Sequence, residues 1–210
     1  MIQLVVFDLG NVIVPFDHLP IAGRLHARAR DRAAHTAAQI HDYIFDWDTG
    51  AYIRYEEGSV DTAAFVGDVC RRFDLDLDPA GFRAIWNDIF TLDAGVAAII
   101  GALKARGARL CILSNTNEMH WSHCRATYPV MGLFDTLVAS HEVRLRKPFR
   151  PIFDELLRRA PGVSPAEVLF IDDWEKNIAG ARAAGIATHH FTGAEGLRAR
   201  LAAEGLLPLP

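Results

Sequence analysis

The chain has 210 residues, of which 50% are hydrophobic and 23% are charged, and its formal net charge is −4. This is the composition of an ordinary globular protein with one sizeable core, or with a core and a small accessory domain. The weakly acidic balance provides no basic surface for nucleic acid or for an acidic membrane. The three cysteines include no C-x-x-C pair, which argues against a disulfide or zinc framework and favours a reducing, cytoplasmic location. No segment is apolar for long enough to span a bilayer, and the N-terminus shows no secretory signal.

The first predicted strand, residues 2–8, is followed by a long stretch without a convincing strand. Within it, residues 61–73 place apolar side chains on one helical stripe behind Asp61, the predicted N-cap, and residues 78–90 favour another helix. A stretch of roughly 70 residues is far longer than a normal connection between strands. We therefore predict a helical cap domain inserted into a catalytic core, with the cap over residues 18–90 and the core over residues 1–17 and 91–210.

From residue 95 onward, helix and strand patterns alternate. Helical patterns cover residues 95–107, 150–160 and 175–185. Ser164 and Glu167 suit a capping box, with Pro165 at the first helical position. Strand patterns cover residues 109–114, 136–140, 168–173 and 186–191. All the predicted strands except the last are almost continuously apolar, which is typical of parallel strands buried on both faces. The sequence thus predicts an α/β fold with a doubly wound, Rossmann-like parallel sheet, which binds ligands at the carboxyl ends of its strands.

Polar side chains follow four of these strands: Asp8, then Ser114 with Asn115, then Lys147, then Asp172 with Asp173. Taken singly, Asp8 fits a loop entry, Ser114 a helix N-cap, and Lys147 a solvated charge. Two adjacent carboxylates after an apolar strand repel each other, however, and a bound cation is a good reason to keep them. Because a doubly wound sheet brings neighbouring strand ends together, we interpret these residues as one site.

This set of side chains suits phosphoryl transfer. A carboxylate can attack phosphorus and form an aspartyl-phosphate, while a hydroxyl and an ammonium group hold the phosphoryl oxygens and neutralise developing charge. Carboxylates with a backbone carbonyl suit octahedral Mg²⁺, which takes few protein ligands and keeps several waters. The expected partner is a small phosphorylated molecule, with neither nucleic acid nor a membrane involved.

In these motifs the sequence resembles the haloacid dehalogenase-like hydrolases. Four segments match the motifs of that family in order: FDLGNV (7–12), LSNTN (113–117), RKP (146–148) and FIDDWEKN (170–177). The resemblance covers nearly the whole chain, including a helical cap between the first two motifs. Within the family it points to the branch of α-D-glucose-1-phosphate phosphatases, which implies a Mg²⁺-dependent phosphatase acting on a sugar phosphate.

The resemblance also implies a role for each matching position. Asp8 would be the nucleophile, and Lys147 would bind phosphate and restrain the Asp8 carboxylate. The implied metal ligands are Asp8, the backbone carbonyl of Gly10, and Asp173. Asp172 would contact these ligands without binding the metal directly. The implied contacts to phosphate or substrate are Ser114, Asn115 and Lys147.

Gly10 departs from the common phosphatase pattern of the family. Most of its phosphatases have a second Asp there as general acid and base, a role worth about 10²–10⁴-fold in rate. The Gly10 carbonyl remains available to a metal, but the proton donor is lost, and the Asn11 amide cannot replace it. Three functions stay open: a phosphatase whose leaving group needs little help, a metal-independent 2-haloacid dehalogenase using Asp8, and a non-catalytic protein that binds a phosphorylated ligand. The acidic pair favours the first, because dehalogenases of the family work without metal.

The cap is expected to close over the site and to contact the leaving group, which would set the substrate specificity. Its most polar and aromatic stretch, residues 44–61, offers six side chains that could contact a sugar: Asp46, Trp47, Tyr52, Arg54, Tyr55 and Glu56. The same pattern equally fits a helix–loop–helix with core aromatics and a solvated edge. Trp86 is expected in the core of the cap. The substrate and the oligomeric state are not determined by the sequence.

Overall fold

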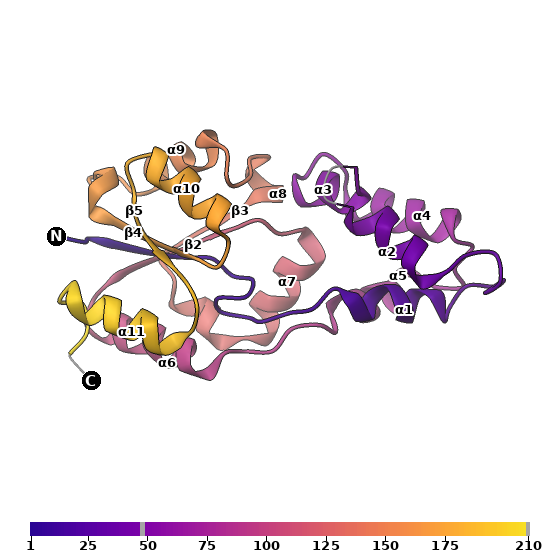
Figure 1. Ribbon diagram of the computed structural model, residues 1–210, viewed down its shortest axis with the longest axis horizontal. Coiled ribbons are helices and arrows are strands. Elements are labelled where there is room, and N and C mark those ends of the chain that lie inside the picture. The colour runs from indigo at the N-terminus through magenta and orange to yellow at the C-terminus, as the bar shows by residue number, and fades with distance from the viewer. Residues whose placement is uncertain (47–48, 209–210) are drawn as a thin grey trace.

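The computed structural model describes residues 1–46 and 49–208. Its core is a five-stranded sheet in which all neighbours are parallel, in the order β3-β2-β1-β4-β5 (Figure 1). The strands are β1 (Leu4–Phe7), β2 (Arg109–Ser114), β3 (Thr136–Ala139), β4 (Val168–Asp172) and β5 (Ala187–His190). They confirm the predicted strands and the α/β fold, although each strand except β2 is shorter than predicted. Asp8 and Asp173 therefore lie just beyond β1 and β4, which are neighbours in the sheet.

Alternate side chains of β1 are buried on opposite faces of the sheet. Val5 and Phe7 belong to one hydrophobic cluster, and Leu4 and Val6 belong to another. The first cluster includes side chains of α6 (Ala94–Ala105), α7 (Glu118–Thr127) and α11 (Ala194–Ala203). The second includes side chains of α9 (Arg150–Arg159) and α10 (Glu175–Ala183), which lie on the other face of the sheet (Figure 1). Burial on both faces explains why the strand is apolar at every position.

Three short helical elements complete the core: η1 (Pro129–Leu133), α8 (Ser140–Val143) and η2 (Pro165–Glu167). The predicted capping box of Ser164 and Glu167 is present, but it closes a single 3₁₀ turn because β4 begins at Val168. Within the residues that the structure describes, no helix has the length and apolar character needed to cross a membrane.

Five further helices stand apart from the sheet as a separate lobe (Figure 1). They are α1 (Leu19–His26), α2 (Ala37–Phe45), α3 (Ala51–Glu56), α4 (Thr62–Arg72) and α5 (Pro79–Asn87). Asp61 is the N-cap of α4, as predicted, and accepts a hydrogen bond of 2.8 Å from the Ala64 amide. The lobe has a hydrophobic cluster that also includes Met119 of α7, and Trp86 is fully buried in it. We call α1–α5 the cap.

Two chain segments connect the cap to the core, and they run side by side. Phe16 and Phe90 form an antiparallel bridge, while the amide groups of Thr91 and Asp93 donate to the carbonyls of Pro15 and Ile13. These contacts lie next to the predicted boundaries at residues 17 and 91. We infer that the division into cap and core follows these boundaries.

Candidate active site

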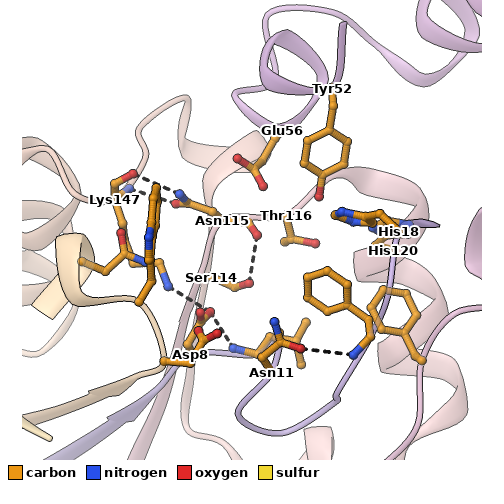
Figure 2. A pocket seen from close by; sticks show the side chains of 17 residues that line it. Asp8, Asn11, His18, Tyr52, Glu56, Ser114, Asn115, Thr116, His120 and Lys147 are labelled. Atoms are coloured by element: carbon orange, nitrogen blue, oxygen red, sulfur yellow. Dashed lines mark hydrogen bonds and ion pairs between the residues drawn. The ribbon is translucent and has the colours of Figure 1, made fainter. Parts of the chain in front are cut away.

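A cavity of about 390 Å³ lies at the carboxyl ends of the strands, between the core and the cap. Its lining includes every predicted site position, namely Asp8, Gly10, Ser114, Asn115, Lys147 and Asp173. Figure 2 shows Asp8, Ser114, Asn115 and Lys147 of the core on one side of the cavity and the cap side chains Tyr52 and Glu56 on the other. The sheet order explains the gathering, because β2, β1 and β4 are neighbours and end at the same edge.

Lys147 is the electrostatic centre of the site. Its ammonium nitrogen lies 2.9 Å from Asp8 Oδ1 and 2.6 Å from Asp172 Oδ2, and its side chain is completely buried. Burial opposes the charged form, but the carboxylates of Asp172 and Asp8 outweigh it and raise the pKa of Lys147. Lys147 is therefore held as a cation between two acidic strand ends.

Asp8 lies in a crowded acidic environment. Burial raises the pKa of its carboxyl group well above the ordinary value; Lys147 opposes this shift, whereas Asp172 and Asp173 add to it. One carboxylate oxygen also accepts a hydrogen bond of 2.6 Å from the Leu9 amide, which fixes the side chain at the strand end. A further positive charge close to Asp8 would favour its ionised form.

Asp172 has both carboxylate oxygens engaged by protein groups. Oδ1 accepts from the Trp174 amide at 2.9 Å and from Asn177 at 3.0 Å, and Oδ2 accepts from Lys147 and from Asn177 at 3.1 Å. Asp172 thus positions Lys147. Asn177 was not singled out from the sequence, although it is the last residue of the FIDDWEKN motif and lies in the first turn of the helix that follows the acidic pair.

The carboxylates of Asp8, Asp172 and Asp173 each offer an oxygen within 4.8 Å of the others, which is close enough to surround one cation. Asp173 is half-buried and lines the cavity, and burial together with Asp172 raises its pKa. Because these donors are all oxygens, they fit a hard cation such as Mg²⁺. Both oxygens of Asp172 are bonded to protein groups, whereas Asp8, Gly10 and Asp173 line the cavity, so the predicted ligand set of these three stays a prediction.

Gly10 is packed against an aromatic ring. A Cβ atom at this position would lie 2.5 Å from Cε1 of Phe16. The Phe16 ring in turn contacts Phe90, with ring centroids 5.8 Å apart, and the Phe16 amide donates to the Asn11 side chain. A side chain at position 10 would therefore have to displace the Phe16 ring.

Ser114 and Asn115 end β2 at the floor of the cavity. Ser114 is buried, and its hydroxyl lies 3.3 Å from the Asn115 carbonyl. The Asn115 amide pairs with the main chain of Lys147: its Nδ2 donates to the Lys147 carbonyl at 3.0 Å, and its Oδ1 accepts from the Lys147 amide at 2.9 Å. The Asn115 side chain thus fastens the Lys147 loop; because Asn115 also lines the cavity, the substrate contact that the resemblance implies stays a prediction.

A family model described as haloacid dehalogenase-like hydrolase matches residues 2–185. The chain belongs to this family. D-ribitol-5-phosphate phosphatase of Bacteroides thetaiotaomicron is 29% identical over 199 residues, covering 85% of this chain and 86% of the relative. Haloacetate dehalogenase H-2 of Moraxella sp. (strain B) is 29% identical over 138 residues, covering 65% of this chain but only 60% of the dehalogenase.

The fold of this hydrolase is also found among solved structures. An enzyme of the haloacid dehalogenase (HAD) family from Bacteroides thetaiotaomicron, solved in complex with magnesium and inorganic phosphate, superimposes on this chain with a TM-score of 0.76 at 26% identity. The match covers 90% of this chain and 93% of the other. The relatives of the hydrolase thus include both phosphatases and dehalogenases, so the family alone does not decide between the two reactions.

The aromatic wall of the hydrolase's cavity includes two imidazole rings that sequence reasoning missed. His18 stacks on Phe45 with centroids 4.5 Å apart, and His120 stacks on Trp86 at 5.2 Å. Burial lowers the pKa of His18 to about 4 and that of His120 to about 3, so both are neutral near pH 7. The position of His120 shortly after the LSNTN motif is the one signal that could have identified it.

The cap stretch predicted to contact substrate divides into several groups. Tyr52 and Glu56 line the cavity, whereas Tyr55 is buried in the cap cluster and bonds to Thr62. The remaining members lie elsewhere: Arg54 lines a separate depression, Asp46 accepts hydrogen bonds from Thr49, and Trp47 falls outside the described residues. Of the described candidates, therefore, Tyr52 and Glu56 are placed to contact a ligand.

Proposed function

We propose that this hydrolase is a Mg²⁺-dependent phosphatase that acts on a small phosphate ester through an aspartyl-phosphate on Asp8. The observation that carries the proposal is the cluster of three carboxylates, those of Asp8, Asp172 and Asp173, with one buried lysine between two of them. Such a cluster holds more negative charge than Lys147 compensates, and a divalent cation would balance it. The similarity to an enzyme solved with magnesium and inorganic phosphate supports the same assignment.

In the proposed reaction, an Asp8 oxygen attacks phosphorus while the bond to the leaving oxygen breaks. Lys147 holds Asp8 in place for this attack and lies where it can neutralise a phosphoryl oxygen, and the Ser114 hydroxyl can bind another. Bound Mg²⁺, held by Asp8, Asp173 and the Gly10 carbonyl, would supply further neutralisation of the phosphoryl charge. Water then attacks phosphorus, releases phosphate and restores the Asp8 carboxylate.

We further propose a sugar phosphate or a related polyol phosphate as substrate. The resemblance to sugar-phosphate phosphatases and the similarity to D-ribitol-5-phosphate phosphatase support this class. Cap residues Tyr52 and Glu56 add a hydroxyl and a carboxyl group to the cavity, and both can form hydrogen bonds with the hydroxyl groups of a sugar.

A second candidate is a 2-haloacid dehalogenase. It is favoured by the glycine at position 10, because halide leaves without a proton, and by the similarity to a haloacetate dehalogenase. A dehalogenase of this family works without metal, so it has no need of Asp173 beside Asp172. We therefore rank it below the phosphatase.

The deciding experiment measures phosphate release from a panel of sugar, polyol and aryl phosphates, with Mg²⁺ and with EDTA. We expect Mg²⁺-dependent release that Asp8→Asn abolishes. Asp173→Asn should raise the Mg²⁺ concentration needed for half-maximal activity, whereas the control Asp154→Asn, on the surface of α9, should not. Full activity of Asp8→Asn would disprove the nucleophile. Chloride release from a 2-chloro acid in EDTA would establish the dehalogenase, and ligand binding without turnover would establish a binding protein.

A further inference from the structure

Glu56 is a buried carboxyl group of the cap that can do more than form a hydrogen bond with a substrate hydroxyl. It is the last residue of α3, it is only 7% exposed, and it lines the cavity. Figure 2 shows its carboxylate pointing into the cavity from the cap, with Asp8 on the opposite side. The two carboxyl groups therefore face the same ligand space from opposite directions.

The backbone of Glu56 is fixed to the core. The Ser140 hydroxyl, in α8, donates a hydrogen bond of 2.6 Å to the Glu56 carbonyl. Two residues further on, Gly58 has a positive φ of 69°, and a Cβ atom there would lie 2.1 Å from the His141 carbonyl oxygen. Because the cap touches the core this closely at its edge, Glu56 has a defined position over the site.

The surroundings of Glu56 suit a group that gains and loses a proton. Burial raises the pKa of Glu56 to about 7, and Glu57 adds to this shift. Arg146 at 3.9 Å, Lys147 and the Tyr52 hydroxyl oppose it. A carboxyl group in this range is partly protonated at neutral pH and can act as acid and as base. His18 and His120 are neutral at this pH because their pKa values are lowered, so neither imidazole can serve as the general acid.

The direction of attack places the leaving group on the side of Glu56. In phosphoryl transfer the attacking and leaving oxygens lie roughly in line through phosphorus. If Asp8 attacks from the floor, the leaving oxygen departs toward the cap. Two residues after Asp8, where most phosphatases of the family have the acid, this chain has Gly10, and the Phe16 ring occupies the space of a side chain there.

We propose that Glu56 is the general acid and base of this site, supplied by the cap in place of the side chain missing at Gly10. This rests on the proposed phosphatase function. In the first step the Asp8–phosphorus bond forms, the ester bond breaks, and Glu56 gives its proton to the leaving oxygen, which departs as an alcohol. In the second step Glu56 takes a proton from water, whose oxygen bonds to phosphorus as the Asp8–phosphorus bond breaks. The net reaction is ester plus water giving alcohol plus phosphate.

The test compares kcat/KM of wild type and Glu56→Gln on two kinds of ester, in Mg²⁺. An alkyl phosphate needs a proton on its leaving oxygen, and we expect Glu56→Gln to lose about 10²–10⁴-fold with it. With p-nitrophenyl phosphate, whose leaving group departs as an anion, kcat/KM should be almost unchanged. Slow hydrolysis of the aspartyl-phosphate in the variant should instead give a burst of p-nitrophenol equal to the enzyme concentration.

The pH profile gives a second readout. For wild type with the alkyl ester, kcat/KM should fall as the pH rises above about 7, because Glu56 loses its proton. Glu56→Gln should lack this limb, and Glu56→Asp should keep it at lower activity. The matched control is Glu57→Gln, at the same helix end, whose side chain pairs with the same Arg146 at 3.2 Å and should behave as wild type.

Equal losses of kcat/KM with both esters, or no loss with either, would overturn the proposal. So would an alkaline limb that persists in Glu56→Gln. Each of these results leaves the phosphatase assignment intact as long as Asp8→Asn is inactive, so the two proposals fail separately.

Discussion

Replacement of Lys147 by methionine is expected to lower the stability of the protein by about 3–5 kcal/mol, the usual cost of removing one partner of a buried ion pair. Lys147 is fully buried and lies within 3 Å of Asp8 (2.9 Å) and Asp172 (2.6 Å). Methionine retains most of the apolar stem, so packing changes little. The loss arises because the carboxylates at this edge of the sheet then face one another without a cation.

The loss should depend on pH in a defined direction. Burial already raises the pKa of Asp8 well above that of an unfolded chain, and removal of Lys147 raises it further. When the pKa of a carboxyl group is higher in the folded state than in the unfolded state, the free energy of unfolding falls as the pH rises from the unfolded-state pKa to the folded-state pKa. The difference in stability between wild type and Lys147→Met should therefore be smaller at acid pH than at neutral pH.

Thermal unfolding followed by circular dichroism measures this difference, in EDTA so that no metal replaces the lost charge. For a chain of this size each kcal/mol shifts Tm by about 2–4 °C, so Tm should fall by about 6–20 °C near neutral pH. The control is Lys104→Met, which removes a partly exposed lysine paired with Asp135 at 2.5 Å and should cost about 0–1 kcal/mol. If Lys147→Met loses no more than this control, or loses the same amount at about pH 5 and about pH 8, the electrostatic account of the site is wrong.

Two further substitutions test how the site and the cap are built. Asn115→Ala removes both hydrogen bonds to the main chain of Lys147, so we expect a loss of about 1–3 kcal/mol in thermal unfolding and a lower kcat for phosphate release; unchanged kinetics would show that Asn115 does not position Lys147. Asp61→Ala removes the N-cap of α4, so we expect a loss of about 0.5–2 kcal/mol with kcat/KM unchanged; a large loss of activity would connect α4 to the site.

Much of the fold and part of the site could be predicted from the sequence, because local patterns encode them. A strand buried on both faces must be apolar at nearly every position, as Leu4–Phe7 is, so the sheet is visible in the chain itself. Polar residues that end such strands gather at one edge whatever the details of packing. This is why Asp8, Lys147 and Asp173 could be assigned to one cavity before the structure was known.

The tertiary structure decided what depends on contacts between distant segments. The pairing of Asn115 with Lys147 and the stacking of His120 on Trp86 both join residues more than 30 positions apart, whose relation no local pattern reveals.

Gly10 and Glu56 show the same division most clearly. The sequence by itself determined that an acid is absent next to Asp8, since a glycine has no side chain to ionise. Only the folded chain brings the Phe16 ring against Gly10 and holds Glu56 over the opposite side of the cavity. The raised pKa of Glu56 follows from its burial where α3 of the cap meets Ser140 of the core, a contact that the sequence does not reveal.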